Sequence, residues 1–174
     1  MGILVSINRA VMLGGFMRFK KLLISFSILS VLTMSKCGLP PEFADFRGLT
    51  PEQEHEKFKT LPIDKKVGFH LVKMRFHPPV LSFAYDIADE GEKNLPYLLE
   101  RLEREHDDMR KHHIIVIFGA IQTISVDLRI RDDIMGRLQT VVDHMREPIW
   151  KEMSEQSLQD IKSTTPKYAL DKTK

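Results

Sequence analysis

The side chains best suited to chemistry are concentrated in one short segment. It reads Glu105-His106-Asp107-Asp108 and is followed by the pair His112-His113. On a helix, Asp108 and His112 are four residues apart and share a face, a spacing at which a carboxylate and an imidazole can bind zinc or another transition metal. Two ligands are too few for a site, so we expect no bound metal and no cofactor, and keep Asp108 and His112 only as candidates.

No other pattern in the chain indicates catalysis. His55-Glu56 begins like the helix of a metalloprotease, but the position four residues after His55 is Lys59 instead of a second histidine. The sequence has no Gly-x-Ser-x-Gly nucleophile elbow and no phosphate-binding glycine loop. We therefore expect no catalytic residues and a protein that is not an enzyme. A metal-binding protein or a metal-dependent enzyme, built on Asp108 and His112, is the alternative.

The charged residues are distributed unevenly along the 174 residues, and the formal net charge of +2 hides this. Residues 1–36 contain no acidic residue and five basic ones: Arg9, Arg18, Lys20, Lys21 and Lys36. Removing these five from the 26 basic residues leaves 21 against 24 acidic ones, a net charge of −3. A mildly acidic body offers no basic surface for a phosphate backbone, so we expect no nucleic-acid partner.

The chain before Cys37 has the three parts of a secretory signal peptide. A cationic stretch, Met-Arg-Phe-Lys-Lys from Met17, precedes 13 mostly apolar residues (Leu22–Met34) and a polar junction. A membrane-spanning helix needs about 20 apolar residues, so this run is short for a permanent anchor. The sequence thus predicts a signal peptide over residues 1–36, with Met17 as the expected true start. An uncleaved N-terminal anchor or a buried helix is the alternative.

The junction at Met34, Ser35, Lys36 and Cys37 resembles the lipobox of bacterial lipoproteins, in which the cysteine is acylated and becomes the mature N-terminus. Met34 and Ser35 fit that pattern, whereas Lys36 occupies a position that selects small residues. The resemblance implies a lipidated Cys37 and attachment to a membrane of the cell envelope. Cleavage after Ser35, which would release a soluble periplasmic protein, is the competing outcome. With one cysteine, the chain cannot form an internal disulfide.

Beyond the leader, the sequence predicts an extended tether over residues 37–49, a helical domain over 50–162 and a flexible tail over 163–174. Thr50-Pro51-Glu52-Gln53 is a capping box with proline at the first helical position. We expect Asp64, Asp107 or Asp108, and Asp132 or Asp133 to cap further helices, and Pro79 and Pro148 to begin two others.

Apolar spacing predicts which helix faces are buried. Leu81, Ala84, Tyr85 and Ala88 recur at steps of three and four, which is typical of a helix with one covered side. The segment 114–118 is rich in β-branched residues and suits a helix or a buried strand. No second strand of similar strength exists to pair with it, so a helix is favoured. Trp150, together with Ile149 and Met153, is expected to pack in the core.

The pattern of Gly91, Leu95-Pro96, Leu98-Leu99 and Leu102, followed by Asp107-Asp108, Arg110 and a second apolar helix, resembles a HEAT/armadillo-type helical repeat. It covers residues 91–124, and residues 132–162 form a second, less regular pair. The resemblance implies an all-α fold, either a small irregular bundle or a short HEAT-like solenoid of about six helices, in which stacked hairpins form the core. It also implies a binding surface for another protein.

We therefore expect a non-catalytic, protein-binding module that is exported to the bacterial cell envelope, with a partner that the sequence does not identify. A periplasmic inhibitor or immunity-type protein is a further alternative.

Overall fold

The computed structural model describes residues 38–76 and 79–166. The predicted signal peptide and the lipidation candidate Cys37 lie outside these residues, and so does most of the predicted tail. The chain divides into residues 1–45 and 46–174, and the helices that follow belong to the second unit. Within the described residues the protein is all-α, as the sequence predicts, and contains no strand. None of the helices in this part is both long enough and apolar enough to cross a membrane.

Seven α-helices account for most of the described chain. They are α2 (Pro51–Lys59), α3 (Ile63–Lys73), α4 (Ser82–Ala88), α5 (Leu95–Arg104), α6 (Asp108–Ile124), α7 (Asp132–Asp143) and α8 (Pro148–Ser163). Three 3₁₀ segments accompany them: η2 (Pro41–Phe46), η3 (Gly91–Asn94) and η4 (Leu128–Ile130). The ambiguous segment 114–118 lies inside α6, so the prediction of a helix there is confirmed.

Three of the predicted helix starts are confirmed. At α2 the capping box is complete, because Thr50 Oγ1 accepts a hydrogen bond from the Gln53 N–H and Gln53 Oε1 accepts one from the Thr50 N–H. At α6 the Asp107 side chain accepts a hydrogen bond from the Arg110 N–H at 2.9 Å. Proline occupies the first position of α8.

Two other starts and one predicted cap are wrong. Helix α3 begins at Ile63 after Pro62, so Asp64 lies in the first turn and does not cap it. Helix α4 begins at Ser82 and not at Pro79. Helix α7 begins at Asp132, but it follows Arg131 without a side-chain cap, so neither aspartate caps it. Because an acidic side chain is favourable anywhere in the first turn of a helix, an aspartate near a helix start does not identify the cap.

The predicted tether is not extended throughout. Residues 41–46 form η2, in which the Phe43 N–H donates a hydrogen bond to the Pro40 carbonyl oxygen at 2.9 Å. The ring of Phe46 is buried and lies on the ring of Phe69 in α3, with 4.2 Å between their centroids. The φ angle that proline imposes suits a helical turn as well as an extended chain. Burial of Phe46 accompanies this turn.

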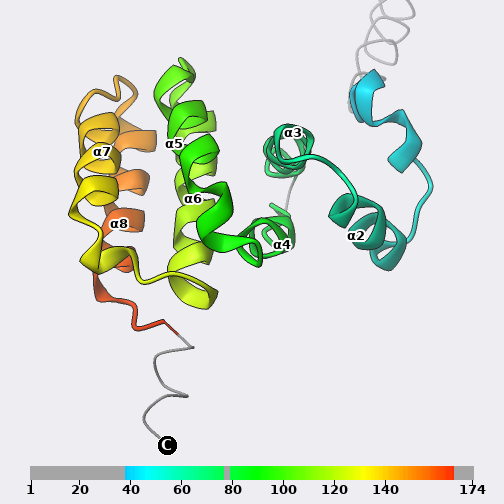
Figure 1. The fold of residues 1–174 in the computed structure, drawn as a ribbon. Coiled ribbons are helices and arrows are strands. Elements are labelled where there is room, and N and C mark those ends of the chain that lie inside the picture. Colours follow the sequence, from blue (N-terminus) through cyan, green and yellow to red (C-terminus); the bar gives the residue numbers. More distant parts are fainter. Residues whose placement is uncertain (1–37, 77–78, 167–174) are drawn as a thin grey trace, which may run out of the picture. The chain divides into compact units, whose positions relative to one another are not determined.

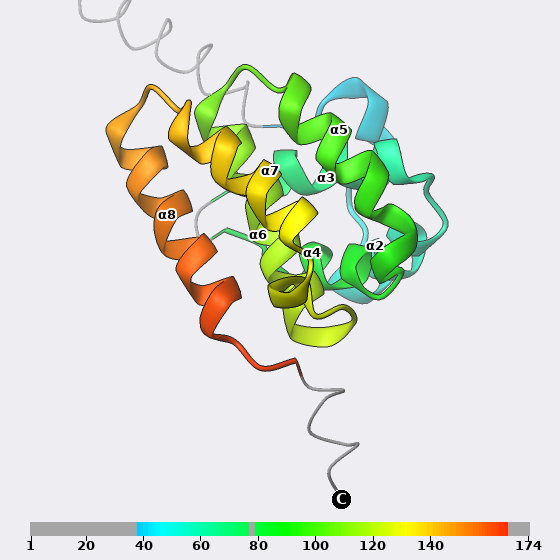
Figure 2. The ribbon, with the colours of Figure 1, turned by 60° about the vertical axis from the view of Figure 1, so that its left-hand side comes forward.

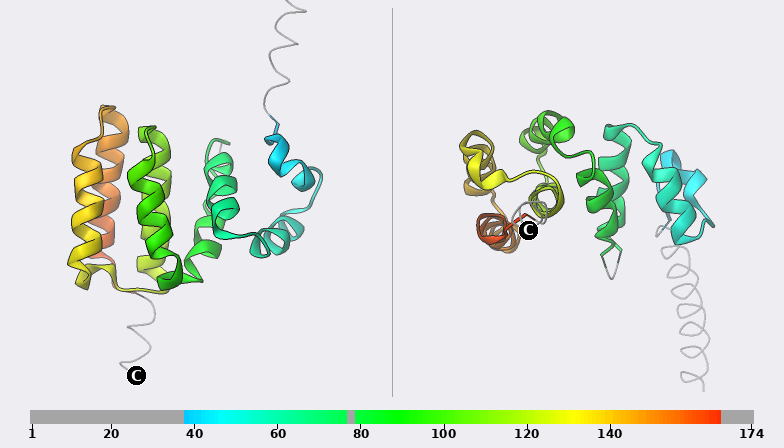
Figure 3. Two further views of the ribbon diagram at one scale, coloured as in Figure 1. Left: turned by 45° about the horizontal axis from the view of Figure 1, so that its top comes forward. Right: turned by 60° about the horizontal axis from the view of Figure 1, so that its bottom comes forward.

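The helices from α3 onward form consecutive pairs, α3–α4, α5–α6 and α7–α8, and α6 is the central helix. Helix α6 packs against α4 on one side and α8 on the other, and also contacts α3 and α5. The α5–α6 and α7–α8 pairs lie side by side, whereas α3 and α4 are seen end-on in the same view (Figure 1). The chain reverses between α7 and α8, so these two helices are antiparallel (Figure 2). The further views show the α5–α6 pair between the α7–α8 pair and α4 (Figure 3).

Two clusters of apolar side chains hold this arrangement together. Aromatic rings fill the space among α2, α3 and α4, where Phe58, Phe69 and Phe83 lie with centroids 4.7 to 5.8 Å apart. The second cluster is aliphatic and includes the fully buried Leu98, Leu102, Ile117, Ile121 and Leu138. Burying a side chain of this size contributes about 1.5–3 kcal/mol to stability, so these clusters fix the positions of the surface residues on the same helices.

Candidate functional site

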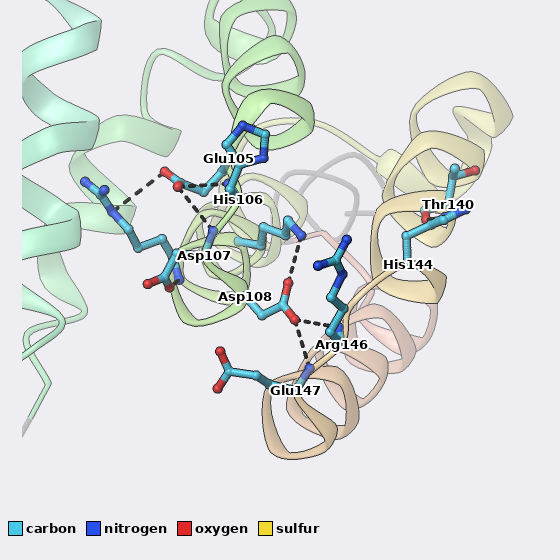
Figure 4. Close-up of polar contacts among 10 residues, drawn as sticks. Glu105, His106, Asp107, Asp108, Thr140, His144, Arg146 and Glu147 are labelled. Carbon is cyan, nitrogen blue, oxygen red and sulfur yellow. Dashed lines mark hydrogen bonds and ion pairs between the residues drawn. The ribbon is translucent and has the colours of Figure 1, made fainter.

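The acidic and histidine-rich segment borders an open cleft of about 420 Å³ at the start of α6. Its walls come from α5, α6 and α7 and consist of Glu103, Glu105, His106, Lys111, Arg137, Thr140, Val141 and His144. Figure 4 shows His106 and His144 on opposite walls. Apart from Val141, every lining residue is polar or charged, so the cleft differs from the mainly apolar pockets that bind small ligands.

The charges of this cleft are balanced by neighbouring side chains. Both carboxylate oxygens of Glu103 accept hydrogen bonds from Arg137, at 2.7 and 2.8 Å, and these bonds hold the pKa of Glu103 below its usual value. Glu105 is buried and accepts a hydrogen bond from Arg101 at 2.8 Å. His144 Nδ1–H donates to the backbone oxygen of Thr140 at 2.7 Å. Glu103 is thus paired across to α7 and Glu105 with its own helix α5, so both acids are held in ion pairs.

Asp108 has a structural role at the start of α8. Its Oδ2 accepts hydrogen bonds from the backbone N–H groups of Arg146 and Glu147, at 2.6 and 2.9 Å, and its Oδ1 accepts one from Lys111 at 2.7 Å (Figure 4). Burial disfavours the charged carboxylate, but these bonds outweigh burial and keep the pKa of Asp108 below its usual value. Asp108 therefore joins the N-terminal ends of α6 and α8.

His112, the other metal candidate, lies beside different partners. Its Nδ1 is 3.2 Å from the hydroxyl of Ser154 in α8. The rings of His112 and His113 both lie beside Trp150, with centroids 5.7 and 5.9 Å from the indole. Across residues 38–76 and 79–166, no three histidine, cysteine, aspartate or glutamate side chains are grouped so that they could hold a metal ion.

A second surface feature, a groove of about 190 Å³, lies across α4, α6 and α8. We call it the α4–α6–α8 groove. Its lining consists of Leu81, Ala84 and Tyr85 from α4, of Ile115, Val116, Gly119, Ala120 and Thr123 from α6, and of Ser157, Asp160, Ile161 and Thr164 from the end of α8. Asp160 is the single charged residue in this lining. The small Gly119 and Ala120 let an occupant approach the α6 backbone closely.

No protein-family model, no curated protein and no solved structure matches the chain. A fold alone would not decide the function, because one fold supports many activities. The cleft is polar and has its acids paired internally, whereas the groove is mainly apolar and is not covered by any of the residues that the structure describes.

Large apolar side chains of the α4 and α8 segments remain exposed at or beside the groove. In α4 the buried residues are Phe83, Ala84, Ile87 and Ala88, while Leu81 and Tyr85 remain 47% and 46% exposed. In α8, Ile149 and Met153 are 62% and 43% exposed instead of packing in the core, and Trp150 is half-buried. The prediction that Ile149 and Met153 pack in the core is wrong, because helical spacing identifies an apolar face but not what covers it.

The exposed side chains of α8 continue the line of the groove. Ile149, Met153 and Ser157 are spaced four residues apart, which places them along one side of the helix. Ser157 lines the groove, so the apolar surface extends from it toward the N-terminal end of α8. The sequence carried one signal of this surface, namely that α6 is apolar around most of its circumference yet has a glycine at its centre.

Proposed function

We propose that this protein is a non-catalytic binding module of the bacterial cell envelope, and that it holds a partner protein in the α4–α6–α8 groove. The observation that carries the proposal is the exposure of Leu81 and Tyr85 beside a floor of small residues. Large apolar side chains gathered on one face are costly to keep in water, and such patches mark interaction sites. Ile149 and Met153 extend the patch along α8.

The size of the groove favours a protein over a small metabolite as its occupant. Pockets for small molecules usually enclose about 300–1,000 Å³, and the groove measures about 190 Å³. Protein interfaces gain most of their affinity from a few apolar or aromatic side chains that enter pockets of the partner surface. The groove therefore suits one or two such side chains, with the exposed apolar residues around it supplying the rest of the contact.

Export to the cell envelope is supported by the order of cationic, apolar and polar segments in residues 17–37. Intact-mass measurement of the protein isolated from native membranes tests it. A diacylglyceryl or triacyl adduct at Cys37 is the result expected for a lipid-anchored protein, and a chain that begins at Lys36 is expected for a soluble periplasmic one. A full-length, unmodified chain would contradict both forms of export.

Site-specific photo-crosslinking in cells tests the groove as a binding surface. A p-benzoylphenylalanine placed at Tyr85 should form a covalent adduct with the partner, because this side chain lies on the edge of the groove. The matched control position is Ile130, which is 78% exposed on η4 and does not line the groove. Adducts of equal yield from both positions, or no adduct from Tyr85, would show that the groove is not the binding surface.

A further inference from the structure

We propose that the segment bound in the α4–α6–α8 groove is a cationic amphipathic α-helix of the partner protein. This inference rests on the proposed function, since it assumes that the groove is the binding surface. It goes further by assigning the secondary structure, the apolar pattern and the charge of the bound segment.

The hydrogen-bonding groups of the groove indicate that the occupant is a helix. The hydroxyl of Thr123 donates to the Gly119 carbonyl oxygen at 2.8 Å, and the hydroxyl of Ser157 donates to the Met153 carbonyl oxygen at 3.0 Å. Because these two hydroxyl groups donate within their own helices, neither donates to the backbone of an extended peptide. The described residues also include no strand edge to which a peptide strand could be added. An occupant must then satisfy its own N–H and C=O groups, as an α-helix does.

The distribution of apolar residues indicates an amphipathic helix. Leu81 and Tyr85 border the groove on the α4 side, and Met153 and Ile149 continue it on the α8 side. A helix placed along this line would cover both sets with one stripe of its own apolar residues. The absence of a side chain at Gly119 allows the stripe to approach α6 closely, since a Cβ atom built there meets nothing within 4 Å.

The charge of the occupant follows from the end of the groove at which α6 and α8 terminate. Gln122 of α6 donates a hydrogen bond to the carbonyl oxygen of Thr164, the C-cap of α8, at 2.7 Å. The C-terminal ends of α6 and α8 therefore lie close together, and each bears partial negative charge.

Side chains reinforce this negative charge. Asp160 lines the groove, and α6 has no basic residue in its last turn. Lys162 of α8 contacts Gln139 of α7 and is not part of the groove lining. Lysine or arginine residues of the partner helix are therefore favoured at this end.

Two glycines provide a matched pair of variants. Gly119 in α6 and Gly136 in α7 both lie inside helices, and a Cβ atom built on either meets nothing within 4 Å. Each also has a threonine four residues later whose hydroxyl donates to the glycine carbonyl oxygen, at 2.8 and 2.9 Å. Gly119→Leu fills the groove, whereas Gly136→Leu places the same side chain on an exposed surface outside it.

Two synthetic helical peptides of about five turns serve as probes of the full chain. They share one leucine stripe and differ only in carrying lysine or glutamate on the opposite face, and their binding is measured by fluorescence anisotropy at low and high salt. The lysine peptide should bind at least tenfold more tightly than the glutamate peptide, and salt should reduce this preference. Gly119→Leu should weaken binding at least tenfold, Gly136→Leu should leave it unchanged, and Asp160→Asn should weaken it several-fold.

A second variant keeps the test valid if Gly119→Leu does not fold. Tyr85→Lys adds a positive charge at an exposed position on the edge of the groove and should weaken binding of the lysine peptide. Equal affinity for the two peptides, or equal effects of Gly119→Leu and Gly136→Leu, would overturn the inference.

The crosslinking experiment separates this inference from the proposed function. An adduct at Tyr85 that maps to a basic helical segment of another protein supports both proposals. An adduct that maps to an acidic segment, or to a second copy of this chain, overturns the cationic partner helix but leaves the groove as a binding surface. Absence of an adduct overturns the proposed function itself.

Discussion

Acidification is expected to destabilise the protein through His70, a fully buried histidine of α3. Its Nε2 lies 3.2 Å from the backbone oxygen of His113 and must carry the hydrogen, since a carbonyl oxygen only accepts. The Nδ1 atoms of His70 and His113 are buried without a hydrogen-bond partner. Burial lowers the pKa of His70 to about 4, and the nearby imidazole of His113 acts in the same direction, against the hydrogen bond to the His113 backbone.

The size of the effect follows from the difference between the folded and unfolded pKa values. The unfolded chain binds a proton at His70 near pH 6.5, whereas the folded protein does so only near pH 4. Between these values the unfolded state binds more protons, so stability is complete above pH 6.5 and falls as the pH falls. For His70 alone the loss is about 1.4 kcal/mol at pH 5.5 and about 2.5 kcal/mol at pH 4.5.

His113 acts in the same direction, because burial lowers its pKa to about 4 as well. His112 and Asp107 are the titratable groups that act on it, the first lowering and the second raising its pKa. Natural domains are stable by about 5–15 kcal/mol, so the two buried histidines account for a large fraction of the total in mild acid.

Denaturant unfolding at pH 7.5, 5.5 and 4.5 measures this loss, with the fluorescence of Trp150 as the signal. The His70→Leu variant should lose about 2.5 kcal/mol less than the parent protein between pH 7.5 and 4.5, whatever its stability at pH 7.5. His106→Gln, in the exposed turn before α6, is the control and should follow the parent profile. Carboxylates with lowered pKa values, such as Asp108 and Asp127, lose their contribution mainly below pH 4.5 and do not obscure the comparison.

A parent protein whose free energy of unfolding is the same at pH 7.5 and 4.5 would refute the reasoning. So would a His70→Leu variant that loses as much stability on acidification as the parent, because the loss would then arise from other groups.

Three further substitutions have expected effects on the free energy of unfolding, measured by urea denaturation at neutral pH. Gln122→Leu should cost about 2–4 kcal/mol, because the Leu128 N–H and the Thr164 carbonyl oxygen, each bonded to the Gln122 side chain at 2.7 Å, would lose their partner. A cost below about 1 kcal/mol would contradict this. Asp108→Ala should cost about 2–3 kcal/mol by removing the acceptor at the start of α8, and Asp108→Asn should cost less because its amide oxygen still accepts. Gly119→Ala and Gly136→Ala should each stabilise the protein by up to about 1 kcal/mol, since a Cβ atom at either position meets nothing within 4 Å. A destabilised variant would show that the added methyl group clashes with a neighbouring side chain.

Much of the fold is predictable from the sequence because local signals and tertiary packing agree. The capping box at Thr50, the cap at Asp107 and the proline at position 148 each mark a helix start that the structure confirms. The starts of α3 and α4 differ from the prediction because an acidic or proline residue lies near, but not at, the helix boundary, and the cap expected at the start of α7 is absent. A residue type thus locates a helix start to within a few positions. The exact first residue depends on which side chain accepts a hydrogen bond from the backbone N–H groups of the first turn.

The functional surface is less predictable than the fold. Acidic and histidine side chains are easily recognised in a sequence, whereas apolar residues that bind a partner look the same as core residues. Asp108 and His112 stand out in the sequence, yet the structure places both in contacts that join α6 to α8. Leu81 and Tyr85 look like core residues, yet they remain exposed. An apolar stripe has the same spacing whether another helix of the chain or a partner protein covers it, so spacing alone could not distinguish the two.

The central position of α6 links these observations to the proposed binding mode. A helix that is apolar on nearly all sides is expected to be covered on all sides. In this chain α3, α4, α5 and α8 cover most of α6, but Val116, Gly119 and Thr123 remain partly exposed on the side that lines the groove. A partner helix placed there would complete the cover. The glycine supports this reading, because a helix whose groove side faced only water would be more stable with alanine at position 119.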